Sequence, residues 1–415
     1  MADETQPPAG YTLVTRPDGT QFLCVNDESA IKPYQLPDPL TFSDGREVLD
    51  DFDWQHRRDQ ILKDFTRYMY GEVPVAAYTL QFTVEEAWTP ALNGLGQRKQ
   101  IGITIETDQG QVTAHLLLHA PAGSGYYPAF LGYNFAGNHT IHPDPAIRLA
   151  EAPWLKDFPP APRGSSVNRW CVEQVVAAGF ALGTIFYGDI DPDYDDGFQN
   201  GIHPLFTTPG HTRPQPHQWG SIAAWAFGLS RALDYLGTEP LVNASQVAVI
   251  GHSRLGKTAL WAGASDARFA AVISNNSGCG GAALSKRAFG ENVQVINHSF
   301  PHWFCGNFKQ YNAREQALPF DQHMQLALIA PRPLYVASAV EDWWSDPRGE
   351  YLGARGASVV YEFLGEKGLP MKTFPPLDQV DLSGKVAYHI RSGGHDITPW
   401  DWEQYLAFFK RHLAD

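Results

Sequence analysis

Short apolar runs and segments of helical periodicity follow one another along the chain, and their order predicts the secondary structure. Strands are expected where β-branched and aromatic residues alternate with polar ones or form an unbroken apolar run. The expected strands are residues 78–87, 98–107, 112–119, 127–135, 181–186, 247–250, 272–274, 333–339 and 386–390. Helices are expected where apolar residues recur every three or four positions, at 53–70, 172–178, 219–236 and 400–413.

The order of these elements predicts an α/β protein. The early strands have the alternating pattern of an antiparallel sheet, because polar and apolar residues take turns along them. Residues 247–250 are apolar throughout, as in a parallel strand that is covered on both faces. Strand and helix units then repeat toward the end of the chain. We therefore expect a three-layer αβα sandwich around a mostly parallel central sheet.

The same pattern predicts one large body preceded by an arm. Residues 1–45 are rich in Pro and Asp and have little periodicity, which indicates an N-terminal arm. No repeat or low-complexity linker divides residues 46–415, so we expect a single domain there. Two stretches without a regular pattern, near 150–170 and at 189–218, are expected to be inserts. Long stretches of this kind are usually functional or disordered.

Composition and charge narrow the possible functions. Hydrophobic residues fill 43% of the 415 positions and charged residues 18%, which excludes a disordered chain. The 31 Lys and Arg against 45 Asp and Glu give a net charge of −14. That charge disfavours nucleic acid and anionic membranes as partners, because phosphate binding needs a basic face. The 12 Trp fit either a sugar-binding surface or a large core.

Other sequence signals concern the compartment and the cysteines. No apolar stretch of about 20 residues is present, so no membrane span is expected. The polar start, 1–5, does not have the pattern of a signal peptide. Cys24, Cys171, Cys279 and Cys305 lack zinc-ligand spacing and leave isolated thiols and disulfides as alternatives. The sequence predicts neither a metal nor a cofactor, and it does not indicate an oligomeric state.

The sharpest motif, Val-Ile-Gly-His-Ser-Arg-Leu-Gly-Lys, occupies residues 249–257. A buried strand ends, Gly251 permits a tight turn, Ser253 stands at its apex, and a helix follows at once. This is the setting of the nucleophile elbow in the α/β-hydrolase fold, where a helix N-terminus faces the developing oxyanion. The motif departs from Gly-x-Ser-x-Gly, because Leu255 takes the second glycine's place and Gly256 follows it.

A serine nucleophile needs a base, and the base needs an acid that orients it. In this fold the three follow in the order Ser, acid, His. His395 lies in a Ser-Gly-Gly-His-Asp loop directly after a predicted late strand, and we expect it to be the base. The acid is expected after the strand that ends at Ala339. Asp342 is the preferred candidate there, and Asp346 and Glu341 are alternatives.

Several longer motifs now show a family resemblance. Together with the elbow, they resemble the bacterial branch of the glucuronoyl esterases, carbohydrate esterase family fifteen, which has the α/β-hydrolase fold. The motifs are residues 134–140, 251–263, 274–282, 300–305, 328–333 and 393–396. The resemblance spans roughly residues 50–413. It implies an enzyme that cleaves the ester between 4-O-methyl-glucuronate on xylan and an alcohol of lignin.

The resemblance also implies roles for individual residues. Ser253 would be the nucleophile and His395 the base of a Ser-His-Asp triad that works through an acyl-enzyme. Arg254 would donate its guanidinium to the oxyanion, where a fixed charged donor outperforms a neutral amide. Lys257 would bond the sugar hydroxyls. Further along the chain, Glu291 would bind the sugar as well.

Trp344 would stack on the sugar by the same resemblance. One departure concerns the acid of the triad. Many family members carry it after the strand that here ends at Ser274, but this chain has Asn276 there, and an amide cannot stabilise an imidazolium by charge. Some bacterial members instead have an acid after the later strand, where Asp342 stands. The resemblance therefore supports the preference for Asp342.

Two other functions stay open at the level of sequence. One is an acetyl-xylan-type carbohydrate deacetylase on the same fold, and the other is a non-catalytic carbohydrate-binding protein with an α/β-hydrolase-like body. The expected partner is glucuronoxylan or a lignin–carbohydrate ester. That polymer predicts a secreted or periplasmic protein whose leader is absent from this chain, with a cytoplasmic protein as the alternative. The leaving alcohol, the 4-O-methyl preference and the xylan length cannot be read from the sequence.

Overall fold

The computed structural model describes residues 6–151, 161–207 and 210–413. Their main feature is a nine-stranded sheet with the order β11-β10-β9-β8-β6-β7-β5-β4-β3. The strands are β3 (Thr79–Ala91), β4 (Gly96–Thr107), β5 (Gly110–Pro121), β6 (Tyr127–Asn134), β7 (Ala181–Phe186), β8 (Val242–His252), β9 (Ala271–Asn275), β10 (Leu334–Ala339) and β11 (Val386–Arg391). Strands β6 to β11 run parallel, and β5, β4 and β3 extend the sheet as an antiparallel edge. The predicted mostly parallel sheet is confirmed.

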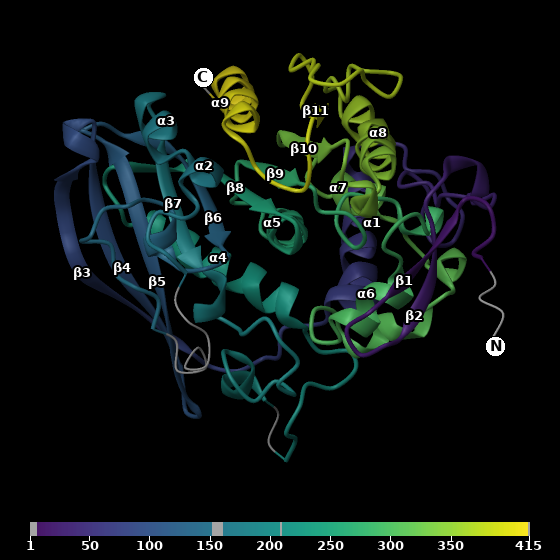
Figure 1. The fold of residues 1–415 in the computed structure, drawn as a ribbon, viewed down its shortest axis with the longest axis horizontal. Coiled ribbons are helices and arrows are strands. Elements are labelled where there is room, and N and C mark those ends of the chain that lie inside the picture. The colour runs from purple at the N-terminus through teal and green to yellow at the C-terminus, as the bar shows by residue number, and fades with distance from the viewer. Residues whose placement is uncertain (1–5, 152–160, 208–209, 414–415) are drawn as a thin grey trace.

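Helices cover both faces of this sheet (Figure 1). On one side lie α1 (Asp51–Phe65), α4 (Ser221–Leu236), α5 (Arg254–Ser265), α7 (Gln322–Ala327) and α8 (Pro347–Phe363), and on the other α2 (Val167–Trp170), α3 (Val172–Ala177) and α9 (Pro399–Leu413). Successive residues of a strand point to opposite faces. Val249 of β8 accordingly belongs to the first hydrophobic core, and Ala248 and Ile250 belong to the second. The predicted three-layer sandwich is confirmed.

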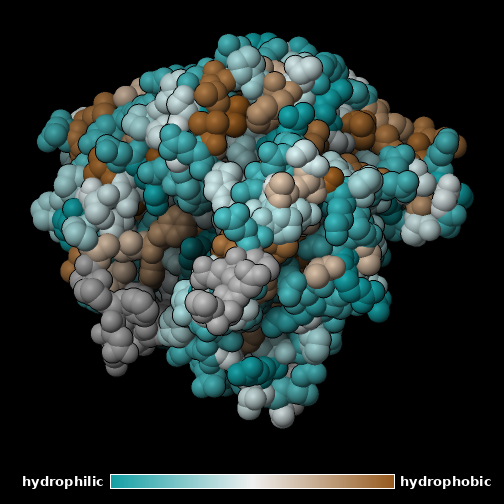
Figure 2. Space-filling view, turned by 45° about the vertical axis from the view of Figure 1, so that its right-hand side comes forward, coloured by the Kyte–Doolittle hydropathy of each residue, from teal (hydrophilic) through white to brown (hydrophobic). Residues whose placement is uncertain are grey.

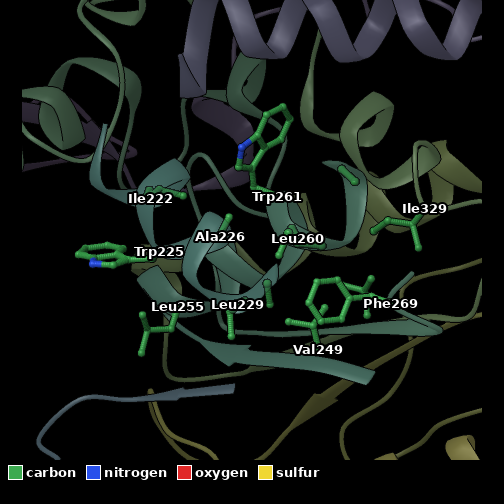
Figure 3. Close-up of a cluster of buried hydrophobic side chains, with 14 of the residues drawn as sticks. Ile222, Trp225, Ala226, Leu229, Val249, Leu255, Leu260, Trp261, Phe269 and Ile329 are labelled. Atoms are coloured by element: carbon green, nitrogen blue, oxygen red, sulfur yellow. The ribbon is translucent and has the colours of Figure 1, made fainter. Parts of the chain in front are cut away.

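Helix α4 is buried along most of its length, because apolar residues occupy nearly every position on it. Figure 3 shows four of its side chains beside α5 and β8: Ile222, Trp225, Ala226 and Leu229 near Leu255, Leu260, Trp261 and Val249. These side chains are at most 5% exposed. Full burial of a large apolar side chain contributes about 1.5–3 kcal/mol. This packing fixes α5, whose first residue directly follows Ser253.

The N-terminal arm carries a hairpin that the sequence pattern did not predict. Strands β1 (Tyr11–Thr15) and β2 (Gln21–Val25) pair antiparallel. The hairpin lies against α6 (Val293–Ser299) on the right of Figure 1, where Phe22 and Cys24 pack on Val295. The backbone oxygen of Val25 also accepts a hydrogen bond from the backbone N–H of Gly290 at 2.9 Å. The arm is thus attached to the body by side-chain packing and by a backbone hydrogen bond.

Most predicted elements agree with the structure within a few residues. Strand β7 has the predicted bounds, whereas the predicted helix 53–70 ends earlier, as α1, and continues as a π-turn over Thr66–Tyr70. Helix α8 has no counterpart among the predicted helices. The predicted insert near 150–170 lies partly outside the described residues. So do two positions of the insert at 189–218.

The four cysteines are all buried and unpaired. Of the two readings of their spacing, the structure therefore has isolated thiols.

Figure 2 shows one face of the molecule, on which hydrophilic side chains predominate and hydrophobic ones form separate patches. Within the described ranges, no helix combines the length and the apolar character that crossing a membrane requires.

Candidate active site

Ser253 lies between the end of β8 and the start of α5, in a strained backbone conformation. Its φ of 58° and ψ of −129° belong to a region that residues other than glycine rarely adopt. A side chain at Gly251 would place its Cβ 1.9 Å from the backbone oxygen of Leu255, so only glycine fits there. At Gly256, a Cβ would meet Ser277 Cβ at 3.1 Å. The displaced second glycine therefore still permits a close approach, between α5 and the loop after β9.

The predicted base and acid are brought together by the loops after β10 and β11. His395 Nδ1 lies 2.6 Å from Asp342 Oδ2, which also accepts a hydrogen bond from Asn276 Nδ2 at 2.8 Å. The carboxylate is buried, and the imidazole side chain is 41% exposed. Burial acts to raise the pKa of Asp342, but the hydrogen bond and charge of His395 outweigh it and hold that pKa below its ordinary value. Asp342 is therefore a carboxylate that fixes the His395 ring.

The two alternative acids have other positions. Asp346 forms an ion pair with Arg287 at 2.8 Å and accepts the backbone N–H of Gly349 at 2.9 Å, so it caps α8. Glu341 is exposed. Of the three carboxylates, the structure places Asp342 against His395.

The ring of His252 lies beside the ring of His395, with 4.4 Å between the centroids. Its Nδ1 donates to Asn275 Oδ1 at 2.6 Å. Burial, together with the charge of His395, lowers the pKa of His252 well below its ordinary value, so this neighbour is neutral. Within the described chain, Ser253 Oγ and His395 form no direct hydrogen bond. Catalytic hydrogen bonds often tighten only when substrate is bound.

Arg254 directly follows Ser253 and is held by a buried carboxylate. Its Nη1 forms an ion pair with Asp193 Oδ2, and its guanidinium lies 5.0 Å from the centre of the Trp303 ring. Asp193 also accepts hydrogen bonds from Tyr187 Oη at 2.8 Å, His302 Nε2 at 3.0 Å and Trp303 Nε1 at 2.7 Å. Arg254 is therefore a positioned cation next to the serine.

The electrostatics of Asp193 favour its charged form. Burial acts to raise the pKa of Asp193, but the hydrogen bond from His302 and the charge of Arg254 outweigh it and lower that pKa. Sequence analysis missed this residue, because the insert at 189–218 has no regular pattern. The arginine in the elbow was the available signal, since a cation that is only partly exposed there needs an anionic partner.

The three predicted sugar-binding residues lie in neighbouring segments. Lys257 is buried, and its Nζ donates to the backbone oxygen of Ser277 at 2.6 Å. The backbone N–H of Glu291 donates to the backbone oxygen of Trp344 at 3.0 Å. Burial raises the pKa of Glu291, and the charges of Lys257 and Arg16 offset only part of that rise.

Arg391 is a second residue that sequence analysis missed. It is buried at the end of β11, and its Nε donates to Asp401 Oδ2 at 2.8 Å. Its two terminal nitrogens donate to backbone oxygens on both sides of His395, at Ser392, Gly394 and Asp396. The loop that carries His395 is therefore held by one planar guanidinium. The partners depend on the shape of the loop, which the sequence does not reveal.

In the part of the chain that the structure describes, no three His, Cys, Asp or Glu side chains are placed to hold a metal ion. The serine, the imidazole and its acid all follow the carboxyl ends of parallel strands. A strained serine between a parallel strand and a helix, in a sheet of this topology, is the architecture of the α/β-hydrolases. The fold and the site thus define the class of protein as an α/β-hydrolase.

Comparison with known proteins narrows this class to a family. A family model described as glucuronyl esterase, fungi, matches residues 213–365. A solved CE15 esterase from a marine bacterial metagenome, described as promiscuous, is 46% identical, with a TM-score of 0.87 over 94% of this chain and all of that one. A solved glucuronoyl esterase from Solibacter usitatus is also 46% identical, with a TM-score of 0.86 over 92% of this chain and 99% of that one. The chain belongs to carbohydrate esterase family 15 and to its bacterial branch.

A more distant relative extends the likeness to fungi. The 4-O-methyl-glucuronoyl methylesterase of Podospora anserina is 27% identical over 384 residues, which cover 88% of this chain and 68% of that protein. The resemblance seen in the sequence motifs is therefore confirmed over most of the chain.

Proposed function

We propose that this chain is a serine esterase that hydrolyses the ester between glucuronate, or 4-O-methyl-glucuronate, of glucuronoxylan and lignin alcohols. The relatives described as glucuronoyl esterase and 4-O-methyl-glucuronoyl methylesterase support this substrate class. The observation that carries the proposal is the position of Lys257 and Glu291. Lys257 and Arg254 both lie against the Trp303 ring. Glu291 is close enough to Lys257 for the two charges to interact, and it adjoins Trp344. A charged donor and a carboxylate suit a polyhydroxylated acyl group.

The proposed mechanism is acyl transfer in two steps. His395 takes the proton of Ser253 while the serine oxygen attacks the C6 carbonyl of the uronate ester. Arg254 and a backbone N–H at the start of α5 bind the oxygen that becomes negative. The alcohol leaves with the proton from His395, and an acyl-enzyme remains. Water, deprotonated by His395, then attacks this ester and releases glucuronate.

The charged groups at the site act where charge develops. Negative charge appears on the carbonyl oxygen only as the reaction proceeds, so the bond from Arg254 strengthens in the transition state and accelerates the reaction. The imidazolium that forms at His395 is stabilised by the ionised carboxylate of Asp342. No proton transfer to Asp342 is needed.

The proposal is tested by a kinetic comparison of esters. We expect kcat/KM for methyl and benzyl glucuronate to exceed that for the matching galacturonates and for p-nitrophenyl acetate. A preference for acetate would instead indicate an acetyl-xylan-type deacetylase. Binding of xylan fragments without turnover of any ester would indicate a non-catalytic binding protein.

The serine assignment has its own test. Ser253→Ala is expected to abolish hydrolysis of benzyl glucuronate, because no other group at the elbow can form the acyl-enzyme. Circular dichroism and the melting temperature check that the fold is unchanged. Turnover retained by the variant would refute Ser253 as the nucleophile.

The proposed substrate also bears on organisation and location. We infer that residues 46–415 act as one catalytic domain, and that the inserts near 150–170 and at 189–218 rim the substrate cleft. The polymer lies outside the cell, so we propose that the protein acts in the periplasm or is secreted. Fractionation of the native host with an antibody to this chain would test that location.

A further inference from the structure

Three cations gather around one pair of stacked aromatic rings next to the serine. The rings of Phe300 and Trp303 are parallel within 2°, with 3.7 Å between their centroids. Arg254 lies 5.7 Å from the Phe300 ring centre, and Lys257 lies 5.6 Å from that of Trp303. The third cation, Arg16, lies 5.9 Å from the Phe300 ring centre. The proposed function uses Arg254 for the oxyanion and Lys257 for the sugar but leaves Arg16 without a role.

Arg16 comes from the N-terminal arm, at the turn between β1 and β2. The turn is closed by hydrogen bonds from the Arg16 N–H to the Thr20 oxygen at 2.8 Å and from the Gly19 N–H to the Arg16 oxygen at 2.9 Å. It is fastened to α6, because Asp18 Oδ2 lies 2.9 Å from His298 Nε2. These contacts hold the Arg16 backbone in place near the active site.

The hairpin is fixed to the same segment that carries Glu291. Phe22 of β2 packs on Val295 and meets the His298 ring edge-on at 5.1 Å. Behind the hairpin, Glu28 forms an ion pair with Arg287 at 2.5 Å. The arm and the segment 287–298 therefore form one packed unit, and Arg16 keeps a fixed relation to Glu291.

The guanidinium of Arg16 has unused hydrogen-bonding capacity. Its Nε is buried and has no hydrogen-bond partner in the described part of the chain. A buried donor without a partner is costly, so such groups commonly bind a ligand or water. Its charge reaches Glu291, because it acts to lower the pKa of that carboxyl. Arg16 and Glu291 therefore share one environment.

We infer that Arg16 is a substrate-binding residue, by which the N-terminal arm donates hydrogen bonds to the hydroxyl oxygens of the glucuronate acyl unit. The inference rests on the proposed function. The oxyanion is not its target, because Arg254 already lies next to Ser253 with its own carboxylate, Asp193. A neutral sugar ester offers hydroxyl oxygens to a guanidinium, and the aromatic ring of Phe300 beneath it excludes water on one side.

Binding can be measured without turnover, which separates this inference from the proposed function. The probe is methyl glucuronate, titrated calorimetrically into the Ser253→Ala protein and into Ser253→Ala/Arg16→Met. Met keeps the apolar contact with Phe300 but removes the donors and the charge. We expect the Kd to rise about 10- to 100-fold, as for the loss of a charge-assisted hydrogen bond. An unchanged Kd would overturn the inference, whether or not the wild type hydrolyses the ester.

A matched control uses an arginine that directly follows the arm. Arg46 is exposed and pairs with Asp44 at 2.9 Å, so Arg46→Met in the Ser253→Ala background is expected to leave the Kd unchanged. Arg16→Lys keeps the charge and is expected to recover only part of the affinity, because it lacks the planar fork. Equal losses for the Arg16 and Arg46 variants would show a general charge effect and would refute a specific contact.

A kinetic readout completes the test in the protein with Ser253 intact. For Arg16→Met, we expect the KM for benzyl glucuronate to rise while kcat changes less than about threefold. The ratio of glucuronate to p-nitrophenyl acetate turnover should fall. A fall in kcat with unchanged KM would place Arg16 at the transition state instead and would contradict the inference. A melting temperature close to that of the wild type excludes unfolding as the cause.

Discussion

Two buried carboxylates near Ser253 each hold a functional side chain, but for different purposes. The carboxylate of Asp342 holds the imidazole of His395, and the carboxylate of Asp193 holds the guanidinium of Arg254. Both carboxyls have a lowered pKa, because the charge and hydrogen bonds of their partners outweigh burial. The two carboxylates differ in the side chain that each one holds, an imidazole for Asp342 and a guanidinium for Asp193.

In the proposed mechanism His395 gains and loses a proton in each cycle, whereas a guanidinium is always charged. The charge of Asp342 would then take part in the chemistry, because it would stabilise the imidazolium. The charge of Asp193 would set only the position of a cation that exists without it. Replacing each carboxylate by an amide of the same shape should thus have very unequal effects.

Asp342→Asn is expected to give the largest effect. Loss of the negative charge should lower kcat for benzyl glucuronate about 10⁴-fold, as in other serine triads, because the imidazolium loses its support. Steady-state kinetics measure the change. Asp346→Asn is the control, since Asp346 caps α8 and pairs with Arg287, so it should lower the melting temperature but largely spare kcat. The opposite result would show that the acid is misassigned.

The amide beside Asp342 allows this result to be sharpened. Asn276 stands where many family members carry the acid, and its Nδ2 already donates to Asp342 Oδ2 at 2.8 Å. Asp342→Asn/Asn276→Asp exchanges carboxylate and amide within one hydrogen bond. We expect it to recover part of the lost kcat. No recovery would show that the position of the charge, and not only its presence, decides the rate.

Asp193→Asn is expected to have a smaller effect. Arg254 keeps its charge but loses its ionic partner, so the oxyanion is stabilised less well. We expect a decrease of about 10-fold to 100-fold in kcat, with little change in its pH dependence, because no proton-transfer group is altered. Asp195→Asn, in the same insert, is the control, since Asp195 accepts the local backbone N–H of Gly197 and, among the described residues, makes no hydrogen bond or ion pair with Arg254. A shifted pH profile for Asp193→Asn would contradict a purely positional role.

Replacing a third carboxyl, Glu350, should have the smallest effect, and that effect should be a pH-dependent change in stability. Glu350 is fully buried and accepts hydrogen bonds from Gly278 N at 2.9 Å and Ser338 Oγ at 2.5 Å. Burial above all, with the charge of Asp342 added, raises its pKa to about 8. The unfolded chain loses this proton near its ordinary pKa of about 4.3, so folding stability falls as pH rises from there to about 8.

Glu350→Gln removes that pH-dependent cost. We expect its melting temperature to exceed that of the wild type by about 2–4 °C at pH 8 and to match it near pH 4. Differential scanning calorimetry at both pH values measures this. A lower melting temperature at pH 8 would mean that Glu350 is ionised and stabilising. The carboxylates of Glu350 and Asp342 would then both be charged.

The comparison also explains which parts of the site the sequence could predict. Ser253, Asp342 and His395 could be predicted because each follows the end of a strand. Such strands can be recognised in the sequence as apolar runs because, like β7, they are buried on both faces. Asp193 lies in an insert whose contacts depend on tertiary folding, and Arg391 binds backbone oxygens that no residue type encodes. The β1–β2 hairpin escaped because it is short and one of its faces is exposed. Helix α8 escaped because its glycines weaken the helical signal.

The four buried thiols bear on how the protein behaves in practice. Burial raises the pKa of Cys24, Cys171 and Cys305 to about 11, so the reactive thiolate is scarce at neutral pH. None of the four is bonded to another. The architecture therefore owes nothing to an oxidising compartment. A host with a reducing cytosol therefore needs no disulfide-forming enzyme to make it, and reductant in a storage buffer has no disulfide to break.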